Sequence, residues 1–166
     1  MDFKYVLDAG AFYAGIPFLS STSMYFTTQA VLNEIKHIKR SIAAIEALLD
    51  SGNLQLFEPG QEETNQVVAT AKKTGDAAHL SKADISILAV ALSLKKAVLV
   101  TDDYAIANVA GVMEIKVKST SSKGIKEIRR WINYCSGCGR TFSSYIKECP
   151  LCGNKLRRKY KRKRSA

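Results

Sequence analysis

Along most of the chain, short runs of apolar residues alternate with longer stretches in which apolar residues recur every three or four positions. Continuous apolar runs are typical of buried strands, and the wider spacing is typical of one helix face. The runs predict strands at residues 4–7, 54–57, 97–100 and 114–117. The spacing predicts helices at residues 31–49, 61–74, 81–94 and 104–110, and a last one around 125–132. The segment 31–49 could be one helix or two, because Ser41 could cap a second.

The order of these elements indicates the fold class. Helices alternate with short apolar strands, which is typical of an α/β domain with a parallel sheet flanked by helices. A segment rich in Gly, Ser and Thr, residues 15–23, predicts a loop. Apolar residues make up 46% of the 166 positions, enough for a core, and no apolar run is long enough to span a membrane. We therefore expect a soluble domain, and a cytoplasmic one because no signal peptide precedes it.

The chain has four cysteines, arranged as two C-x-x-C pairs ten residues apart: Cys135, Cys138, Cys149 and Cys152. Two residues between cysteines let one tight turn offer both sulfurs to one metal, and four thiolates suit tetrahedral Zn²⁺. The alternative is two disulfides in a secreted protein, which the clustering of the pairs and the lack of a signal peptide disfavour. The spacing therefore predicts a zinc ribbon with a structural Zn²⁺.

Positive charge is concentrated at the C-terminal end. Residues 1–131 carry 15 Lys/Arg against 14 Asp/Glu, whereas residues 132–166 carry 10 against a single Glu. Eight of the ten residues 155–164 are basic. Such a run could be a disordered tail, a nuclear-import signal or a phosphate-binding arm, and beside a zinc ribbon it favours nucleic acid, RNA in particular. We expect a body at 1–130, a ribbon at 131–156 and a basic tail at 157–166.

Acidic residues occur where a parallel sheet places its ligand site. Asp8 follows the first predicted strand, and Asp102 and Asp103 follow the strand at 97–100. Ligands of such sheets bind beyond the carboxyl ends of strands. Glu34 and Asp84 fall on the apolar side of their predicted helices, so we expect them to point toward the sheet. Unpaired buried charge is costly, and a divalent cation held by converging carboxylates would remove the cost.

Each acid also has a purely structural interpretation. Asp84 could complete a capping box with Ser81, three residues earlier. Asp8 could end its strand in a turn, Asp102 or Asp103 could cap the next helix, and Glu34 could be a solvated residue at a helix edge. Taken singly, these interpretations are the better ones. Taken together, the placement of all the acids at element ends favours a metal site.

Four segments carry a resemblance to a known family: 6–12 (VLDAGAF), 31–35 (VLNEI), 81–85 (SKADI) and 98–103 (VLVTDD). They resemble the four acidic motifs of PIN-domain ribonucleases, and the resemblance covers roughly residues 1–130. With the zinc ribbon and the basic tail, the arrangement is similar to the Nin-one-binding family, endonucleases that mature the 3′ end of small-subunit ribosomal RNA. The absence of a large insertion is more similar to archaeal than to eukaryotic members.

The resemblance implies a PIN-like fold and a metal-dependent endoribonuclease that acts on precursor small-subunit rRNA within a pre-ribosomal particle. Carboxylates suit Mg²⁺ or Mn²⁺ as the catalytic ion. Asp8, Asp84 and either Asp102 or Asp103 would bind it directly or through water, and Glu34 would bind metal or orient the attacking water. Thr101 could hydrogen-bond within the same site. The alternatives are a toxin-type PIN ribonuclease and a non-catalytic RNA-binding or pre-ribosome-binding factor.

Overall fold

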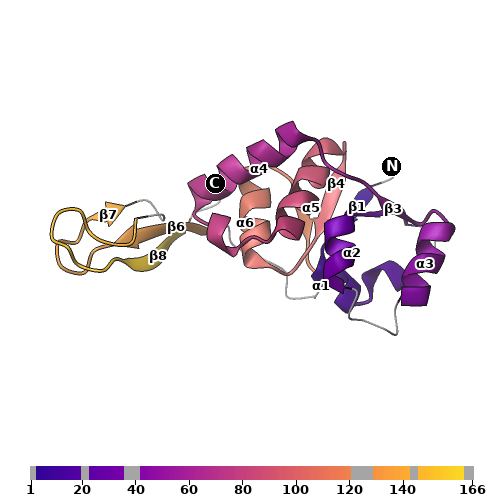
Figure 1. Ribbon diagram of the computed structural model, residues 1–166, viewed down its shortest axis with the longest axis horizontal. Helices are drawn as coiled ribbons and strands as arrows, with labels where there is room; N and C mark the ends of the chain where they lie inside the picture. Colours follow the sequence, from indigo (N-terminus) through magenta and orange to yellow (C-terminus); the bar gives the residue numbers. More distant parts are fainter. Residues whose placement is uncertain (1–2, 20–22, 36–41, 121–128, 143–145, 163–166) are drawn as a thin grey trace.

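The computed structural model describes residues 3–19, 23–35, 42–120, 129–142 and 146–162, and it contains two sheets (Figure 1). The larger sheet has five parallel strands in the order β3-β2-β1-β4-β5. They are β1 (Lys4–Leu7), β2 (Tyr25–Thr27), β3 (Leu54–Leu56), β4 (Ala97–Val100) and β5 (Lys116–Lys118). The chain leaves β1 toward β2 on one side and returns to β4 on the other. The carboxyl ends of β1 and β4 therefore form the switch point at which such sheets bind ligands.

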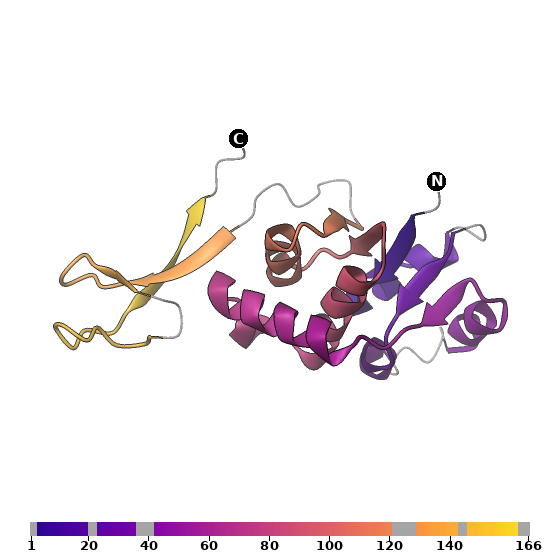
Figure 2. The same cartoon turned by 90° about the horizontal axis from the view of Figure 1, so that it is seen from above.

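Helices connect the strands. They are α1 (Ala9–Tyr13), α2 (Gln29–Ile35), α3 (Ile42–Asp50), α4 (Gln61–Thr74), α5 (Lys82–Ser93) and α6 (Tyr104–Val112), with short 3-10 turns η1 (Ile16–Phe18) and η2 (Ala77–His79). The last three helices lie on one face of the sheet, where α5 packs on β1 and β4 and α6 packs on β5 (Figures 1 and 2). The turn η1 lies against the opposite face, where the Tyr25 hydroxyl donates to the carbonyl of Ile16 at 3.4 Å. No helix of the described residues is long and apolar enough to cross a bilayer.

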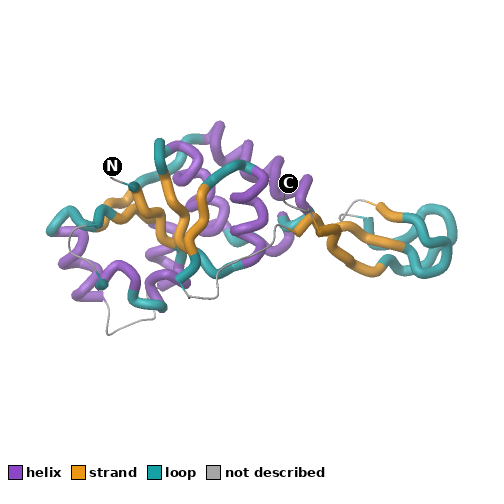
Figure 3. The backbone as a smooth tube through the Cα atoms, turned by 180° about the vertical axis from the view of Figure 1, so that it is seen from behind, coloured by secondary structure: helices purple, strands orange, loops and turns teal. Residues whose placement is uncertain are grey.

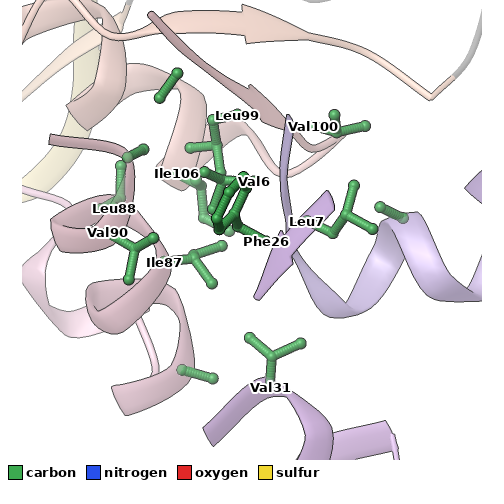
Figure 4. Close-up of a cluster of buried hydrophobic side chains, with 14 of the residues drawn as sticks. Val6, Leu7, Phe26, Val31, Ile87, Leu88, Val90, Leu99, Val100 and Ile106 are labelled. Carbon is green, nitrogen blue, oxygen red and sulfur yellow. The ribbon is translucent and has the colours of Figure 1, made fainter. Parts of the chain in front are cut away.

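The core lies between the sheet and α5 (Figure 4). Val6 and Leu99 are register partners on β1 and β4, and both are fully buried. Ile87 of α5 and Ile106 of α6 lie beside them in the same cluster (Figure 4). Burying each such side chain contributes about 1.5–3 kcal/mol. This packing fixes the positions of the loops that follow β1 and β4.

The sequence located most of these elements, and the end signals explain why. Helix α4 matches the predicted 61–74, and it ends at Gly75, which has the left-handed φ of 83° that favours glycine. Helix α5 begins after Ser81, in the predicted capping box. The predicted helix at 31–49 contains residues of α2 and of α3, and residues 36–41 lie outside the described part. Helix α6 continues through Gly111 to Val112, and the left-handed turn falls on Glu114 instead, with a φ of 59°.

Two predictions of secondary structure were wrong. Strand β2 was not predicted, because its three residues, buried throughout, are too few to show a period. The helix expected around 125–132 is contradicted at Arg129–Ile132, which belong to strand β6 (Arg129–Tyr134). Residues 121–128 lie outside the described part. A segment of 6 residues is too short for the pattern of apolar positions to separate a strand from a helix.

The second sheet is antiparallel, in the order β7-β6-β8. Strand β7 is Thr141–Phe142, and β8 is Arg157–Arg162. The residues expected as the start of a basic tail therefore form a strand, in which Arg158 pairs with Asn133 of β6. Backbone pairing with β6 fixes this basic segment beside the ribbon (Figure 2).

Candidate active site and zinc centre

Asp8 lies at the carboxyl end of β1 and begins α1. Its Oδ1 accepts a hydrogen bond from the Ala11 N–H at 2.6 Å, and the Thr101 side chain also hydrogen-bonds it. Only 5% of Asp8 is exposed. A Cβ placed on Gly10 would lie 3.3 Å from Asp8 Oδ1, so the absence of a side chain there keeps this carboxylate uncrowded. Asp8 therefore caps α1, a role different from the strand-ending turn that the sequence suggested, and its carboxylate is buried at the switch point.

Asp102 and Asp103 follow β4 but have different partners. Asp102 is exposed, and its oxygens accept hydrogen bonds from the Ser119 and Thr120 hydroxyls and from the Thr120 N–H at 3.2 Å. Asp103 caps α6, because its Oδ1 accepts from the backbone N–H of Ala105 at 2.6 Å and of Ile106 at 3.2 Å. The geometry therefore gives the capping role to Asp103 and leaves Asp102 beside β1.

Asp84 takes part in the capping box that the sequence predicted. Its Oδ2 accepts from the Ser81 N–H at 2.7 Å, and its own N–H donates to the Ser81 hydroxyl at 3.1 Å. It is half-buried at the first turn of α5. Capping does not remove it from the acid cluster, because its charge acts on Asp8.

The pKa of Asp8 reports how these carboxylates interact. Burial raises the pKa of Asp8, hydrogen bonds from Thr101 and Ala11 lower it, and the charges of Asp84 and Asp102 raise it again. The net shift is upward from the ordinary value. Asp8, Asp84 and Asp102 are thus brought together by the fold, although they are separated by as many as 94 positions in the sequence. The charges of Asp84 and Asp102 oppose the ionisation of Asp8, so the group favours a cation between the three acids.

Glu34 does not lie as expected. It is exposed near the end of α2, so the prediction that it points toward the sheet was wrong. Val31 and Ile35, one turn apart, occupy the buried side of α2. A helix of this length has room for only one apolar stripe, and Glu34 falls beside it. The charges that act on Asp8 come from Asp84 and Asp102, and Glu34 faces solvent.

The carboxylates form a looser group than the cysteines. Among the described residues, only the four cysteines form a group of three or more potential ligands with all ligand atoms within 4.8 Å. Oxygen donors are the right chemistry for Mg²⁺ or Mn²⁺, and Mg²⁺ commonly keeps several waters and uses one or two carboxylates. The three aspartates therefore fit a hydrated divalent ion rather than a closed protein cage.

The cysteine pairs form two equivalent turns. The Gly139 N–H donates to the Cys135 carbonyl and the Gly153 N–H to the Cys149 carbonyl, each at 2.9 Å. Both glycines have a φ of 70°, in the left-handed region. The sulfurs of Cys135 and Cys152 lie 3.3 Å apart, and those of Cys138 and Cys149 lie 3.6 Å apart. Four sulfurs at about 2.3 Å from a tetrahedral Zn²⁺ are separated by roughly 3.8 Å, so the cluster fits this ion.

The thiol pKa values indicate the same need for a cation. The backbone N–H of Cys138 lowers the pKa of Cys135 to about 6. The backbone N–H of Asn154 lowers the pKa of Cys152, but the thiols of Cys135 and Cys149 outweigh it and bring the pKa to about 12. The pKa of Cys149 is also lowered and that of Cys138 is raised, so two thiolates are favoured and the other two are opposed by them. A bound Zn²⁺ would remove this opposition.

A buried acid that the sequence analysis missed joins the ribbon to the body. Asp76 follows α4, is 1% exposed and accepts a hydrogen bond from Asn108 Nδ2 at 2.5 Å. Arg158 of β8 lies 3.5 Å from Asp76 Oδ1, donates to the Gly75 carbonyl at 3.1 Å and contacts the His79 ring. Burial raises the pKa of Asp76, against the lowering effects of Asn108, Thr74, Arg158 and His79. The polar Asn108 within the otherwise apolar α6 was the signal that could have revealed this contact.

We expect Arg158→Ala to loosen the docking of β8 on α4, because Asp76 would lose its cation and the Gly75 carbonyl its donor. Charge-assisted hydrogen bonds contribute about 1.5–3 kcal/mol, so amide exchange across Gly75 and β8 should become at least about tenfold faster. Arg157→Ala is the matched control, because Arg157 is the preceding, exposed residue of the same strand. Equal exchange in the two variants would show that Arg158 does not hold the ribbon.

Comparisons with known proteins agree with this geometry. Residues 5–94 match the family described as the PIN domain of ribonuclease. The chain is 36% identical to Endoribonuclease Nob1 of Pyrococcus abyssi over 164 residues, which is 98% of this chain and 97% of that protein. It is 37% identical to Endoribonuclease Nob1 of Methanocaldococcus jannaschii over 93% of this chain and 76% of that protein. It is 34% identical to Ribonuclease VapC1 of Thermoplasma acidophilum over 97% of this chain and 80% of that protein. The similarity therefore spans both the carboxylate and the cysteine sites.

Proposed function

The chain belongs to the PIN-domain ribonucleases, in the group of the Nob1 endoribonucleases, and from this membership we propose that it is a divalent-metal-dependent endoribonuclease that cleaves precursor small-subunit rRNA at its 3′ end. The observation that carries the proposal is buried Asp8, whose pKa is raised by burial and by the charges of Asp84 and Asp102. Such a shift at a strand end is typical of a functional site.

In the proposed site, Asp8, Asp84 and Asp102 hold Mg²⁺ or Mn²⁺, directly or through water. The ion, when bound, supplies an activated water and charge neutralisation at the leaving oxygen of a phosphodiester. Asp8 is kept in place by the Ala11 N–H and the Thr101 hydroxyl, and the Ser119 and Thr120 hydroxyls orient Asp102. Glu34 is assigned to the solvent side, where it would orient water rather than bind the ion.

The ribbon has a structural and RNA-binding role in this proposal. We propose that its four cysteines hold one structural Zn²⁺, which folds the module without taking part in chemistry. The acid cluster repels phosphate, whereas the segment 132–166 carries 10 Lys/Arg against one Glu. The basic strand β8 would therefore supply the attraction for RNA that the active site lacks.

A second candidate is a ribonuclease with other RNA substrates, such as a toxin-type PIN ribonuclease. The relative that favours it is the protein named Ribonuclease VapC1, which matches over most of its length. The relatives named Endoribonuclease Nob1 and the positive charge of the C-terminal segment support the rRNA substrate instead. The position of the cut separates the two candidates.

Substitutions of the two adjacent aspartates, Asp102 and Asp103, test the proposal. Asp102→Asn should lower cleavage of single-stranded RNA in Mn²⁺ by about 10²-fold or more, because a metal ligand is lost. Asp103→Asn should retain most of the activity, since Asn caps a helix almost as well as Asp. Initial rates of cleavage of a fluorescent oligoribonucleotide would measure both. Loss of activity in Asp103→Asn with a normal rate in Asp102→Asn would reverse the assignment, and normal rates in both would contradict the proposed site.

A further inference from the structure

One face of the large sheet carries exposed lysines over aromatic rings. On β5, Lys118 Nζ lies 5.4 Å from the ring centroid of Tyr5, and Lys116 Nζ lies 5.4 Å from that of Phe3. The rings of Tyr5 and Tyr25 are 6.1 Å apart, so the aromatic row continues across β1 to β2. This is the face opposite to α4, α5 and α6, and in Figure 3 the strands of the sheet lie in front of these helices.

These side chains are accessible to solvent. Both lysines are exposed, Phe3 is 41% exposed and Tyr5 is half-buried. Val117, between the two lysines, points to the opposite side and packs against the core. The body as a whole is almost neutral, with 15 Lys/Arg against 14 acids in residues 1–131. The lysine pair on this face is therefore a local concentration of positive charge next to exposed π-faces.

The row leads directly to the acid cluster. Lys118 is followed by Ser119 and Thr120, whose hydroxyls contact Asp102. The Thr101 N–H donates to the Lys118 carbonyl at 3.0 Å, which joins the end of β5 to the loop that carries Asp102. At about 3.3 Å per residue, Lys116 and Lys118 lie roughly 7 Å apart along β5, and Ser119 and Thr120 follow directly after its end. The two lysines therefore lead toward the loop in which Ser119 and Thr120 contact Asp102.

We propose that the face formed by Phe3, Tyr5, Lys116 and Lys118 binds the single-stranded RNA segment next to the bond that is cut. The lysines contact successive phosphates, and the rings of Phe3 and Tyr5 offer surfaces on which bases stack. Positive side chains interleaved with aromatic ones are the combination that binds single strands without sequence readout. This inference rests on the proposed nuclease function and adds the path of the substrate.

Edge protection is the competing explanation. Strand β5 is at the edge of the sheet, and lysines on edge strands prevent pairing with another chain. Edge protection does not require exposed rings beneath the lysines, nor a position next to the acid cluster. It predicts that removing the lysines promotes self-association and leaves RNA affinity unchanged.

The test measures binding of a short fluorescein-labelled single-stranded oligoribonucleotide to protein carrying Asp84→Asn. In this background, Lys116→Ala with Lys118→Ala should weaken binding about tenfold and reduce the slope of log affinity against log salt by about 1.4, since each phosphate contact contributes about 0.7. Lys73→Ala with Lys95→Ala removes the same charge from exposed positions elsewhere and should leave affinity within about twofold.

A second variant separates stacking from charge. Phe3→Ala should weaken binding by about tenfold while leaving the salt slope unchanged, because no charge is lost. Equal affinity and slope in the Lys116/Lys118 double variant and its control would overturn the proposal, as would self-association with normal RNA affinity. Cleavage by the wild-type protein is measured in parallel. A protein that cleaves without using this face refutes the substrate path alone, whereas one that does not cleave refutes the nuclease function.

Discussion

Replacing Asp84 by Asn is expected to lower RNA cleavage by about 10²–10³-fold or more while leaving RNA affinity intact or raised. Asn retains a side-chain oxygen that accepts from the Ser81 N–H, so the capping box and helix α5 should persist. What is lost is one of the three charges that act together at the switch point. Removing negative charge also reduces the repulsion of phosphate, which is why affinity should not fall.

The same substitution at Asp8 adds a measurement of stability. Burial and the neighbouring acids raise the pKa of Asp8, so the folded protein binds this proton more tightly than the unfolded chain. Without metal, the ionised carboxylate lowers stability above its folded-state pKa, and stability recovers as the pH falls toward 3.8. Asp8→Asn should be inactive, because it loses a charge of the proposed metal site. Without metal it should also be more stable, and a gain of about 1 kcal/mol in the free energy of unfolding would raise its Tm by about 2–4 °C.

Glu62→Gln is the matched control for both variants, because Glu62 is an exposed acid in the first turn of α4. It should retain normal cleavage, since its charge is not part of the cluster. Full activity in Asp84→Asn would contradict the metal-nuclease account and favour a non-catalytic RNA-binding factor. The rate and the thermal midpoint are both needed, because an unfolded variant would also be inactive.

Replacing Cys135 by Ser is expected to abolish the binding of one Zn²⁺ per chain and to unfold the sheet of β6, β7 and β8. Structural zinc supplies about 10–16 kcal/mol of apparent binding energy in small modules, and the described side chains of β6, β7 and β8 take no part in the hydrophobic core cluster. The body should remain folded, because its core lies between the large sheet and α5. Elemental analysis gives the zinc content, and amide exchange gives the order of each sheet.

Ser136→Ala is the control within the same turn, because Ser136 is exposed and lies between two of the ligands. It should bind zinc normally. A Cys135→Ser protein whose second sheet stays protected from exchange would show that backbone pairing alone holds the ribbon. Loss of protection in the body as well would show that docking through Arg158 stabilises both parts.

The sequence predicted features that depend on local signals. The ends of α4 and α5 were found because Gly75 and the Ser81–Asp84 box act within one turn. The cysteine cluster was found because its spacing is set by the metal. The helix signals lie within one turn of the ends that they fix, and the cysteines were recognised because the C-x-x-C spacing occurs twice.

Features that depend on distant partners were not predicted. The sequence could not distinguish Asp102 from Asp103, because the difference lies in Ser119 and Thr120 at the end of β5. Asp76 follows a helix-ending glycine, as loop residues commonly do, and only packing by Asn108 and Arg158 makes it a buried acid. Strand β8 pairs with β6 over the cysteine turns that separate them in the sequence, and composition alone does not reveal this pairing.

The most direct measurement is to map the new RNA ends after incubating the purified protein with a small-subunit rRNA precursor and Mn²⁺. The account predicts one principal cut, at the mature 3′ end of the rRNA. The cut should be absent in Asp84→Asn and in the presence of a chelator that leaves the ribbon zinc bound. Cleavage at unrelated sites in many RNAs would favour the second candidate. No cleavage by folded, zinc-loaded protein in Mn²⁺ would contradict the claim that the three aspartates form a nuclease site.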